Sequence, residues 1–95
     1  MVISSPSNEL VKRARALRTR KGRERTGMFV VEGSRAIATV VAAGAAVDVV
    51  LTVPDFDEPR LARLPVRRET ITAELLATLT DEVSPPGCLA LVASP

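Results

Sequence analysis

The chain has 95 residues, a net charge of +2 and 46% hydrophobic residues, a composition that predicts one globular domain with room for a core. It has no histidine and one cysteine, Cys88, which excludes an internal disulfide, Ser-His or Cys-His catalysis, and a zinc site of the usual kind. The chain shows no signal segment and no apolar run long enough to cross a bilayer, so we expect a cytoplasmic protein.

The first helix is predicted to begin at Ser5 and Pro6, with serine as N-cap and proline at the first helical position; Ser7 is a competing cap. Its apolar residues recur at helical spacing and form one stripe: Leu10, Val11, Ala14 and Leu17. The opposite face carries Asn8, Lys12, Arg15 and Thr19, and Arg13 and Arg18 flank the stripe. One side of this helix therefore suits a core, and the other presents cations and an amide.

After this helix, residues 20–26 are predicted to form a loop, because Gly22 and Gly27 interrupt the pattern. Strands are predicted at residues 28–31, 47–53, 66–68 and 88–93, and helices at 35–43, 58–63 and 73–79. Ser34 and Thr72 are the expected N-caps of two of these helices, and residues 85–87 are expected to turn. Continuous apolar strands favour a sheet covered on both faces, so we predict a small α/β/α sandwich with about four strands.

The charges are distributed unevenly along the chain. Eight of the thirteen cations lie between Lys12 and Arg25, where only Glu24 opposes them, whereas the chain from Ala36 onward has four cations and eight acids. Such a cluster is typical of a surface that meets a polyanion. With Phe29 and Phe56 as the only aromatic residues, we expect contacts to phosphates rather than stacking on bases. The alternative is a solvated charged face with no partner.

Two smaller features are also candidates. A strand that runs through Glu32 and Gly33 into a helix exposes free N–H donors to an anion, beside the cation Arg35; the alternative is that Arg35 pairs with Glu32. Asn8 is a candidate for contact with a base edge or a 2′-hydroxyl. Cys88 is interpreted as a structural thiol. No catalytic residue and no glycine-rich nucleotide loop is predicted.

Several short motifs occur at a specific spacing. They are Ile3-Ser4-Ser5, Asn8, Val11-Lys12, Lys21-Gly22-Arg23, Gly27-Met28-Phe29 and Val31-Glu32-Gly33-Ser34-Arg35. This pattern resembles the opening of the SpoU (TrmH-type) RNA ribose 2′-O-methyltransferases. Ser84-Pro85-Pro86-Gly87 resembles the Ser-Pro-Gln-Gly segment that closes the same domain of that family, with Pro86 and Cys88 as departures.

The resemblance implies that residues 1–95 form a single substrate-binding domain, similar in fold to ribosomal proteins that bind kinked RNA. It also implies a separate knotted catalytic domain, expected after Pro95, which binds S-adenosylmethionine and forms a homodimer. No cofactor is expected in residues 1–95, and structured ribosomal RNA is favoured over transfer RNA as the partner. The predicted RNA-binding residues are Asn8, Lys12, Arg15, Arg18, Arg20, Lys21, Arg23, Arg25 and Arg35.

The predicted function is to position structured RNA for ribose 2′-O-methylation by the separate catalytic domain. Two alternatives stay open at this point. One is a free-standing RNA- or ribosome-binding protein with no methyltransferase activity. The other is a protein-interaction module whose basic face meets an acidic partner.

Overall fold

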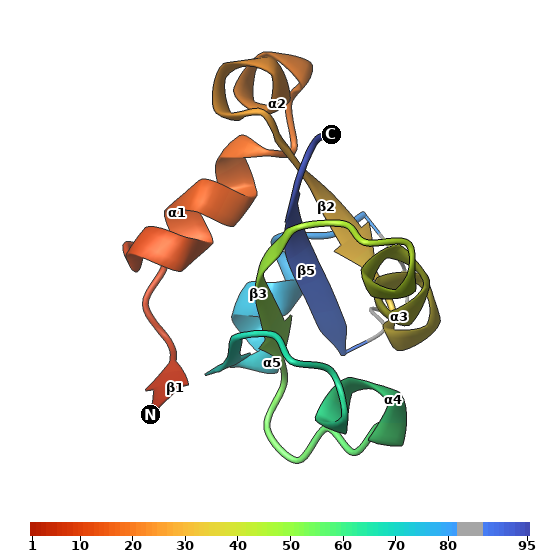
Figure 1. The fold of residues 1–95 in the computed structure, drawn as a ribbon. Coiled ribbons are helices and arrows are strands. Elements are labelled where there is room, and N and C mark those ends of the chain that lie inside the picture. Colours follow the sequence, from red (N-terminus) through yellow and green to blue (C-terminus); the bar gives the residue numbers. More distant parts are fainter. Residues whose placement is uncertain (82–86) are drawn as a thin grey trace.

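The computed structural model describes residues 1–81 and 87–95. Its centre is a five-stranded sheet in the order β1-β4-β3-β5-β2 (Figure 1). The strands are β1 (Val2–Ile3), β2 (Met28–Glu32), β3 (Val47–Thr52), β4 (Arg68–Ile71) and β5 (Cys88–Ala93). The central strand β3 is parallel to β4 and antiparallel to β5, and β2 is the edge strand next to β5.

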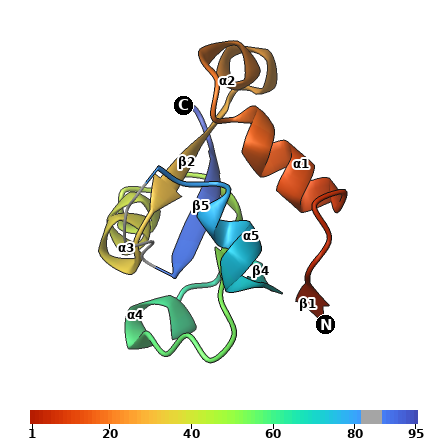
Figure 2. The same ribbon diagram turned by 180° about the vertical axis from the view of Figure 1, so that it is seen from behind.

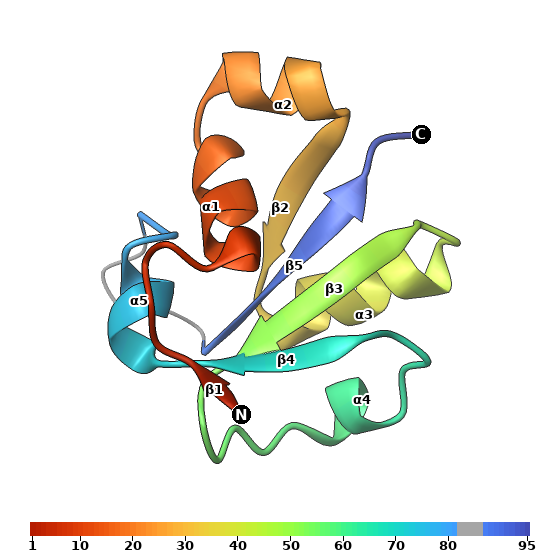
Figure 3. The same ribbon diagram turned by 90° about the vertical axis from the view of Figure 1, so that its left-hand side faces the viewer.

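Helices cover both faces of this sheet. They are α1 (Glu9–Ala16), α2 (Arg20–Thr26), α3 (Ser34–Ala42), α4 (Pro59–Ala62) and α5 (Ala73–Ala77). Residues of α1 and α5 share one buried cluster with the sheet, and residues of α3 and α4 share the other. Figure 2 and Figure 3 show α2 beyond the end of α1, at the margin of the sheet. The predicted α/β/α sandwich is therefore confirmed, with one more strand than expected.

The alternation of side chains along β3 and β5 explains how one sheet supplies two cores. Val49 and Leu51 of β3 and Leu91 of β5 face α1 and α5, whereas Val50 and Val92 face α3 and α4. All five are fully buried, and each such side chain contributes roughly 1.5–3 kcal/mol to folding. The continuous apolar runs in the sequence correctly indicated strands that are buried on both faces.

Two strands, β4 and β1, differ from the prediction because pairing with a neighbouring strand, not local pattern, sets them. The strand predicted at residues 66–68 lies at Arg68–Ile71, where Arg68 pairs with Val50 and Thr70 with Thr52. The two-residue strand β1, which pairs with β4, was not predicted because two residues are too few for any periodicity.

The last helix, α5, is shorter than predicted. Its predicted cap is confirmed, because the Thr72 hydroxyl accepts from Leu75 N–H at 3.3 Å, but the helix ends at Ala77 rather than at residue 79. The turn predicted at residues 85–87 falls largely outside the described residues.

Candidate nucleic-acid interface

Helix α1 packs on the sheet through its predicted apolar stripe. Leu10, Val11, Ala14 and Leu17 are at most 8% exposed. Lys12 and Arg15 point away from the core and are exposed, and Arg15 Nη1 reaches only the backbone oxygen of Pro6, at 3.4 Å. The predicted apolar stripe is confirmed, and of the predicted opposite face Lys12 and Arg15 lie on the exposed side of α1, whereas Asn8 and Thr19 lie outside the helix as N-caps of α1 and α2.

The start of α1 differs from the prediction and gives Asn8 a structural role. The helix begins at Glu9, and Asn8 is its N-cap: Oδ1 accepts from Leu10 N–H at 2.8 Å and from Val11 N–H at 3.4 Å. Ser5 and Pro6 precede the helix, so the prediction of a serine cap was wrong. An asparagine oxygen satisfies two amide donors here, which the exposed Ser5 and Ser7 hydroxyls, paired with each other at 2.8 Å, do not do. The contact of Asn8 with RNA stays a prediction.

Two arginines beside the stripe hold parts of the fold together. Arg13 Nη2 donates to Asp48 Oδ2 at 2.5 Å, at the start of β3. Arg18 donates to Thr78 O at 2.7 Å and pairs with Asp81, which ties the end of α1 to the end of α5. Part of the cation cluster therefore stabilises the tertiary structure, although exposed pairs of this kind contribute only up to about 1 kcal/mol.

Residues 20–26 form the helix α2, so the loop predicted there was wrong. Thr19 caps the helix by accepting from Gly22 N–H at 3.0 Å, and Gly27 ends it in the left-handed conformation, with φ of 69°. Gly22 is buried because the helix packs closely on the end of α1: a Cβ at this position would lie 1.8 Å from Ala16 O. Gly22 permits the close approach of the two helices, and Gly27 forms the C-cap. The prediction interpreted both glycines as signs of a loop.

Four of the seven residues of α2 are exposed cations. Arg20 forms an i,i+4 pair with Glu24 at 2.9 Å, and Arg23 Nη1 donates to Leu17 O at 3.0 Å. Among the described residues, Lys21 and Arg25 have no hydrogen-bonded or ionic partner. Two caps and two intramolecular arginine contacts thus fix a short helix that is otherwise held only by its packing.

We define the basic surface as the exposed cations of α1, α2 and the residues between them. Its members are Lys12, Arg15, Arg18, Arg20, Lys21, Arg23 and Arg25. Figure 1 shows that these elements lie together at one side of the molecule. The structure brings seven of the nine predicted site residues into this surface, and Asn8 lies at the far end of α1.

Arg35 is separated from the basic surface. It lies in the first turn of α3, on the other face of the sheet from α1, and the five residues of β2 separate the end of α2 from the start of α3 by about 17 Å. The ion pairs of the described residues do not include the alternative pair of Arg35 with Glu32. Gly33, not Ser34, is the N-cap of α3, so the serine cap predicted here was wrong by one residue.

An acidic group already lies near the start of α3. The Ser34 hydroxyl donates to Glu58 Oε2 at 3.1 Å, and Glu58 Oε1 accepts from Arg60 N–H at 3.1 Å. These bonds, first that from Arg60 N–H, hold the pKa of the Glu58 carboxyl below its ordinary value. An anion at Gly33 to Arg35 would therefore meet a charged carboxylate, which makes this end of α3 a weaker anion site than the sequence suggested.

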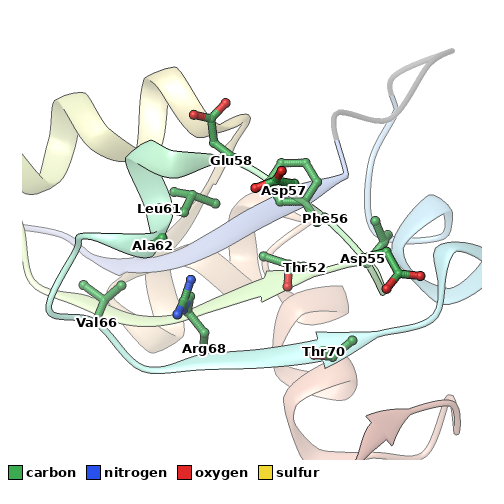
Figure 4. Close-up of a pocket in the computed structure, with 11 residues that line it drawn as sticks. Thr52, Asp55, Phe56, Asp57, Glu58, Leu61, Ala62, Val66, Arg68 and Thr70 are labelled. Carbon is green, nitrogen blue, oxygen red and sulfur yellow. The ribbon is translucent and has the colours of Figure 1, made fainter.

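A cavity of about 620 Å³ lies on the same face of the sheet, between α4 and the ends of β3 and β4 (Figure 4). Its lining includes the carboxylates of Asp55, Asp57 and Glu58 and a single cation, Arg68. Because carboxylates outnumber cations here, the cavity is unsuited to a phosphate backbone. The face formed by α3 and α4 is therefore chemically unlike the basic surface.

The remaining chemistry is sparse. Burial raises the pKa of the Cys88 thiol to about 11, which supports a structural rather than a reactive thiol. Within residues 1–81 and 87–95, no three His, Cys, Asp or Glu side chains gather as metal ligands would. None of the helices in that part of the chain has the length and apolar character needed to span a membrane.

Glu32 is the polar residue that the sequence did not single out correctly. It was considered as the end of a strand, as part of the Val31–Arg35 motif and as a partner of Arg35, yet among the described residues its buried Oε1 accepts no hydrogen bond. Strand alternation is the signal that would have placed it, since Met28, Val30 and Glu32 share the face of β2 toward α1.

Comparison with known proteins gives one consistent family. Residues 8–90 match the family model of the MRM3-like substrate binding domain. A solved RNA 2′-O ribose methyltransferase is 28% identical, with a TM-score of 0.86, and the match covers 100% of this chain and 38% of that one. The SpoU methyltransferase AviRb from Streptomyces viridochromogenes, in complex with the cofactor AdoMet, is 25% identical, with a TM-score of 0.80, over 93% of this chain and 36% of that one.

More distant structures extend the likeness of fold. An rRNA methyltransferase from Sinorhizobium meliloti is 18% identical, with a TM-score of 0.79, over 100% of this chain and 37% of that one. No curated protein matches the chain in sequence. The chain spans 36–38% of the length of these three solved relatives.

Proposed function

The chain belongs to the family of MRM3-like substrate-binding domains, and from this premise we propose that it binds structured RNA and positions it for ribose 2′-O-methylation. The methyl group would come from S-adenosylmethionine held by a separate catalytic domain, C-terminal to Pro95, through which the whole protein would form a homodimer. Ribosomal RNA is the proposed substrate, in preference to transfer RNA.

The observation that carries this proposal is the basic surface. Its seven exposed cations lie on and between two capped helices, and Glu24 is the only acid between Lys12 and Arg25. Because these cations are not needed to close the core, their number on one side of the molecule is best explained by a polyanionic partner. Arginine in particular suits phosphate groups, which it contacts with two parallel hydrogen bonds.

The proposed role is one of positioning. Contacts to phosphates fix the orientation of an RNA without reading its sequence. An RNA held on two helices that pack on the sheet would present its target ribose in a defined place, and orientation of this kind lowers the barrier of the chemical step. In this proposal residues 1–95 supply binding and orientation, and the catalytic groups belong to the separate domain.

The position of the last strand fits such an arrangement. Ser94 N–H donates to Gly27 O at 2.7 Å, so the chain leaves β5 beside the end of α2. A catalytic domain joined after Pro95 would start next to the basic surface, close to the RNA that this surface is proposed to hold.

S-adenosylmethionine is assigned to the catalytic domain and not to this one. This assignment is part of the proposal: it follows from the family resemblance, which implies that the cofactor is bound by the knotted catalytic domain, and the titration below tests it.

The test is a set of titrations of residues 1–95 at several salt concentrations. We expect saturable binding to a structured ribosomal RNA fragment, with a log–log salt slope of roughly −3 to −4 for four to five phosphates. Polyglutamate should not bind, and S-adenosylmethionine should give no heat. Polyglutamate binding without RNA binding would favour the acidic-partner alternative. Saturable binding of S-adenosylmethionine would contradict the proposal that the cofactor binds only the separate catalytic domain.

The free-standing alternative needs a different measurement. The intact mass of the natural protein from cells should show a further domain of roughly 150 residues, a typical domain size. A natural protein that ends near Pro95 would favour an RNA- or ribosome-binding protein without methyltransferase activity.

A further inference from the structure

One buried polar group has no role in the fold as described. Glu32 ends the edge strand β2, and within residues 1–81 and 87–95 no group donates a hydrogen bond to its buried Oε1. Native structures rarely leave a buried acceptor without a donor, because such a group is costly in the free protein. A partner that brings N–H donors would satisfy it.

The location of Glu32 points to one place for that partner. Residues of β2 alternate, so that Val30 and Glu32 face the layer of α1 and α5. There they line a cavity of about 280 Å³, whose other lining residues are Leu17, Leu79, Arg18, Arg23, Thr80 and Asp81. This volume is far larger than the roughly 30 Å³ of a water molecule, and just below the range of about 300–1,000 Å³ typical of sites for drug-sized ligands.

The cavity combines three kinds of surface. Leu17, Val30 and Leu79 provide apolar walls. Two carboxylates line the cavity. That of Asp81 is held by Arg18, and that of Glu32 is the acceptor left for a ligand, which a rotation about its broad terminal torsion brings to the cavity. Arg18 and Arg23 are donors, and their bonds to Thr78 O, Asp81 and Leu17 O leave further N–H groups of each guanidinium unused among the described residues.

We propose that this cavity binds one unpaired guanine base of the RNA. Guanine is the base whose Watson–Crick edge carries two adjacent N–H donors, N1–H and the N2 amino group, next to a carbonyl oxygen, O6. The carboxylate of Glu32 takes the two donors, and Arg18 or Arg23 donates to O6. Apolar side chains enclose the ring, as they do around bases taken out of a helix.

The proposal rests on the proposed function and adds a base-specific contact to it. The cavity adjoins the basic surface, since Arg18 and Arg23 belong to both. The phosphates on either side of the base therefore meet cations, while the base edge meets Glu32. Phosphate contacts alone carry no sequence information, so Glu32 supplies the discrimination that the basic surface lacks.

The experiment uses RNA hairpins of equal melting temperature that differ in a single unpaired nucleotide. We expect residues 1–95 to bind the guanine hairpin about tenfold more tightly than the adenine hairpin, with inosine, which lacks the N2 amino group, in between. Glu32→Gln should bind the guanine and adenine hairpins alike, with the salt slope of the wild type. The control Glu74→Gln removes an exposed carboxylate from the first turn of α5 and should keep the guanine preference.

The outcomes separate the two proposals. If the wild type binds the hairpins with equal affinity and a steep salt slope, the guanine proposal is wrong and the proposed function stands. A guanine preference that survives Glu32→Gln also overturns the assignment to Glu32. If no hairpin binds, the proposed function itself fails. Should Glu32→Gln not fold, the comparison of guanine with inosine on the wild type still decides.

Discussion

The two helical layers bury apolar side chains in the same way but differ in the charges that they carry at the surface. In the layer of α3 and α4, Glu58 caps α4 and accepts from Ser34, and the cavity there sets the carboxylates of Asp55, Asp57 and Glu58 against the cation Arg68. In the layer of α1, with α2 at its end, Arg13 and Arg18 make such contacts, whereas Lys12, Lys21 and Arg25 have no ionic partner among the described residues.

The two layers thus differ in their balance of charge and not in pairing, because Arg35, Arg63 and Arg68 near α3 and α4 also have no ionic partner among the described residues. Both layers close over the sheet with fully buried aliphatic side chains, such as Val11 on one face and Ile37 on the other. Packing therefore does not require a surplus of cations on one side. The surplus is the feature that needs a functional explanation, and each prediction below alters one side of the comparison.

The largest effect is expected at the contact of α2 with α1. Gly22→Ala places a Cβ against Ala16 O. Because the helices must move apart to make room for it, the free energy of unfolding should fall by roughly 1–3 kcal/mol. Urea unfolding measures the loss. Gly27→Ala is the matched control: a Cβ there meets open space, so only the left-handed backbone opposes it, at about 1 kcal/mol. Equal stability of Gly22→Ala and the wild type would show that α2 does not pack on α1 in this way.

The second effect concerns the cations without partners. Lys21→Ala combined with Arg25→Ala should weaken binding to a ribosomal RNA fragment about tenfold. The log–log salt slope should flatten by about 1.5, because each lost phosphate contact removes roughly 0.7–0.9. The matched control, Arg60→Ala with Arg63→Ala, removes the same charge from the region of α4. If the two double variants weaken binding equally, net charge and not the basic surface governs affinity.

The third effect concerns the cap of α1. Asn8→Ala should lower the unfolding free energy by about 1 kcal/mol, because two amide N–H groups lose their acceptor. Ser7→Ala, which alters the neighbouring exposed hydroxyl, should stay within about 0.5 kcal/mol of the wild type. Thermal unfolding compares them. An unchanged melting temperature with altered preference among RNAs would instead assign Asn8 to recognition.

The smallest effect is expected at the ion pair that joins α1 to β3. A double-mutant cycle of Arg13→Ala and Asp48→Ala should give a coupling of about 0.2–1 kcal/mol, as exposed pairs do. Arg13→Ala should weaken RNA binding less than Lys12→Ala, its neighbour on the exposed face. A stronger loss of binding with Arg13→Ala would extend the basic surface toward β3.

The sequence predicted the elements whose pattern is local. The stripe of α1, the buried strands β2, β3 and β5, and the Thr72 cap follow from periodicity and side-chain chemistry alone. These features need no knowledge of the neighbours in space, and together they define the α/β/α class.

The errors occurred where tertiary contacts decide. Gly22 suggests a loop until the close approach of α2 to Ala16 is known, and β4 takes its register from β3. Asn8 outcompetes Ser5 as N-cap because the first turn of α1 is positioned by Leu10 and Val11 in the core. The basic surface was predictable from charge alone, whereas the unpartnered oxygen of Glu32 depends on which elements surround it.

The most direct test of the central claim is the footprint of RNA on the isotope-labelled domain, followed by amide chemical shifts. We expect a ribosomal RNA fragment to perturb mainly residues 12–27, on and around α1 and α2, and to leave residues 55–70 near α4 unchanged. Perturbations concentrated at residues 55–70, with residues 12–27 unaffected, would contradict the central claim.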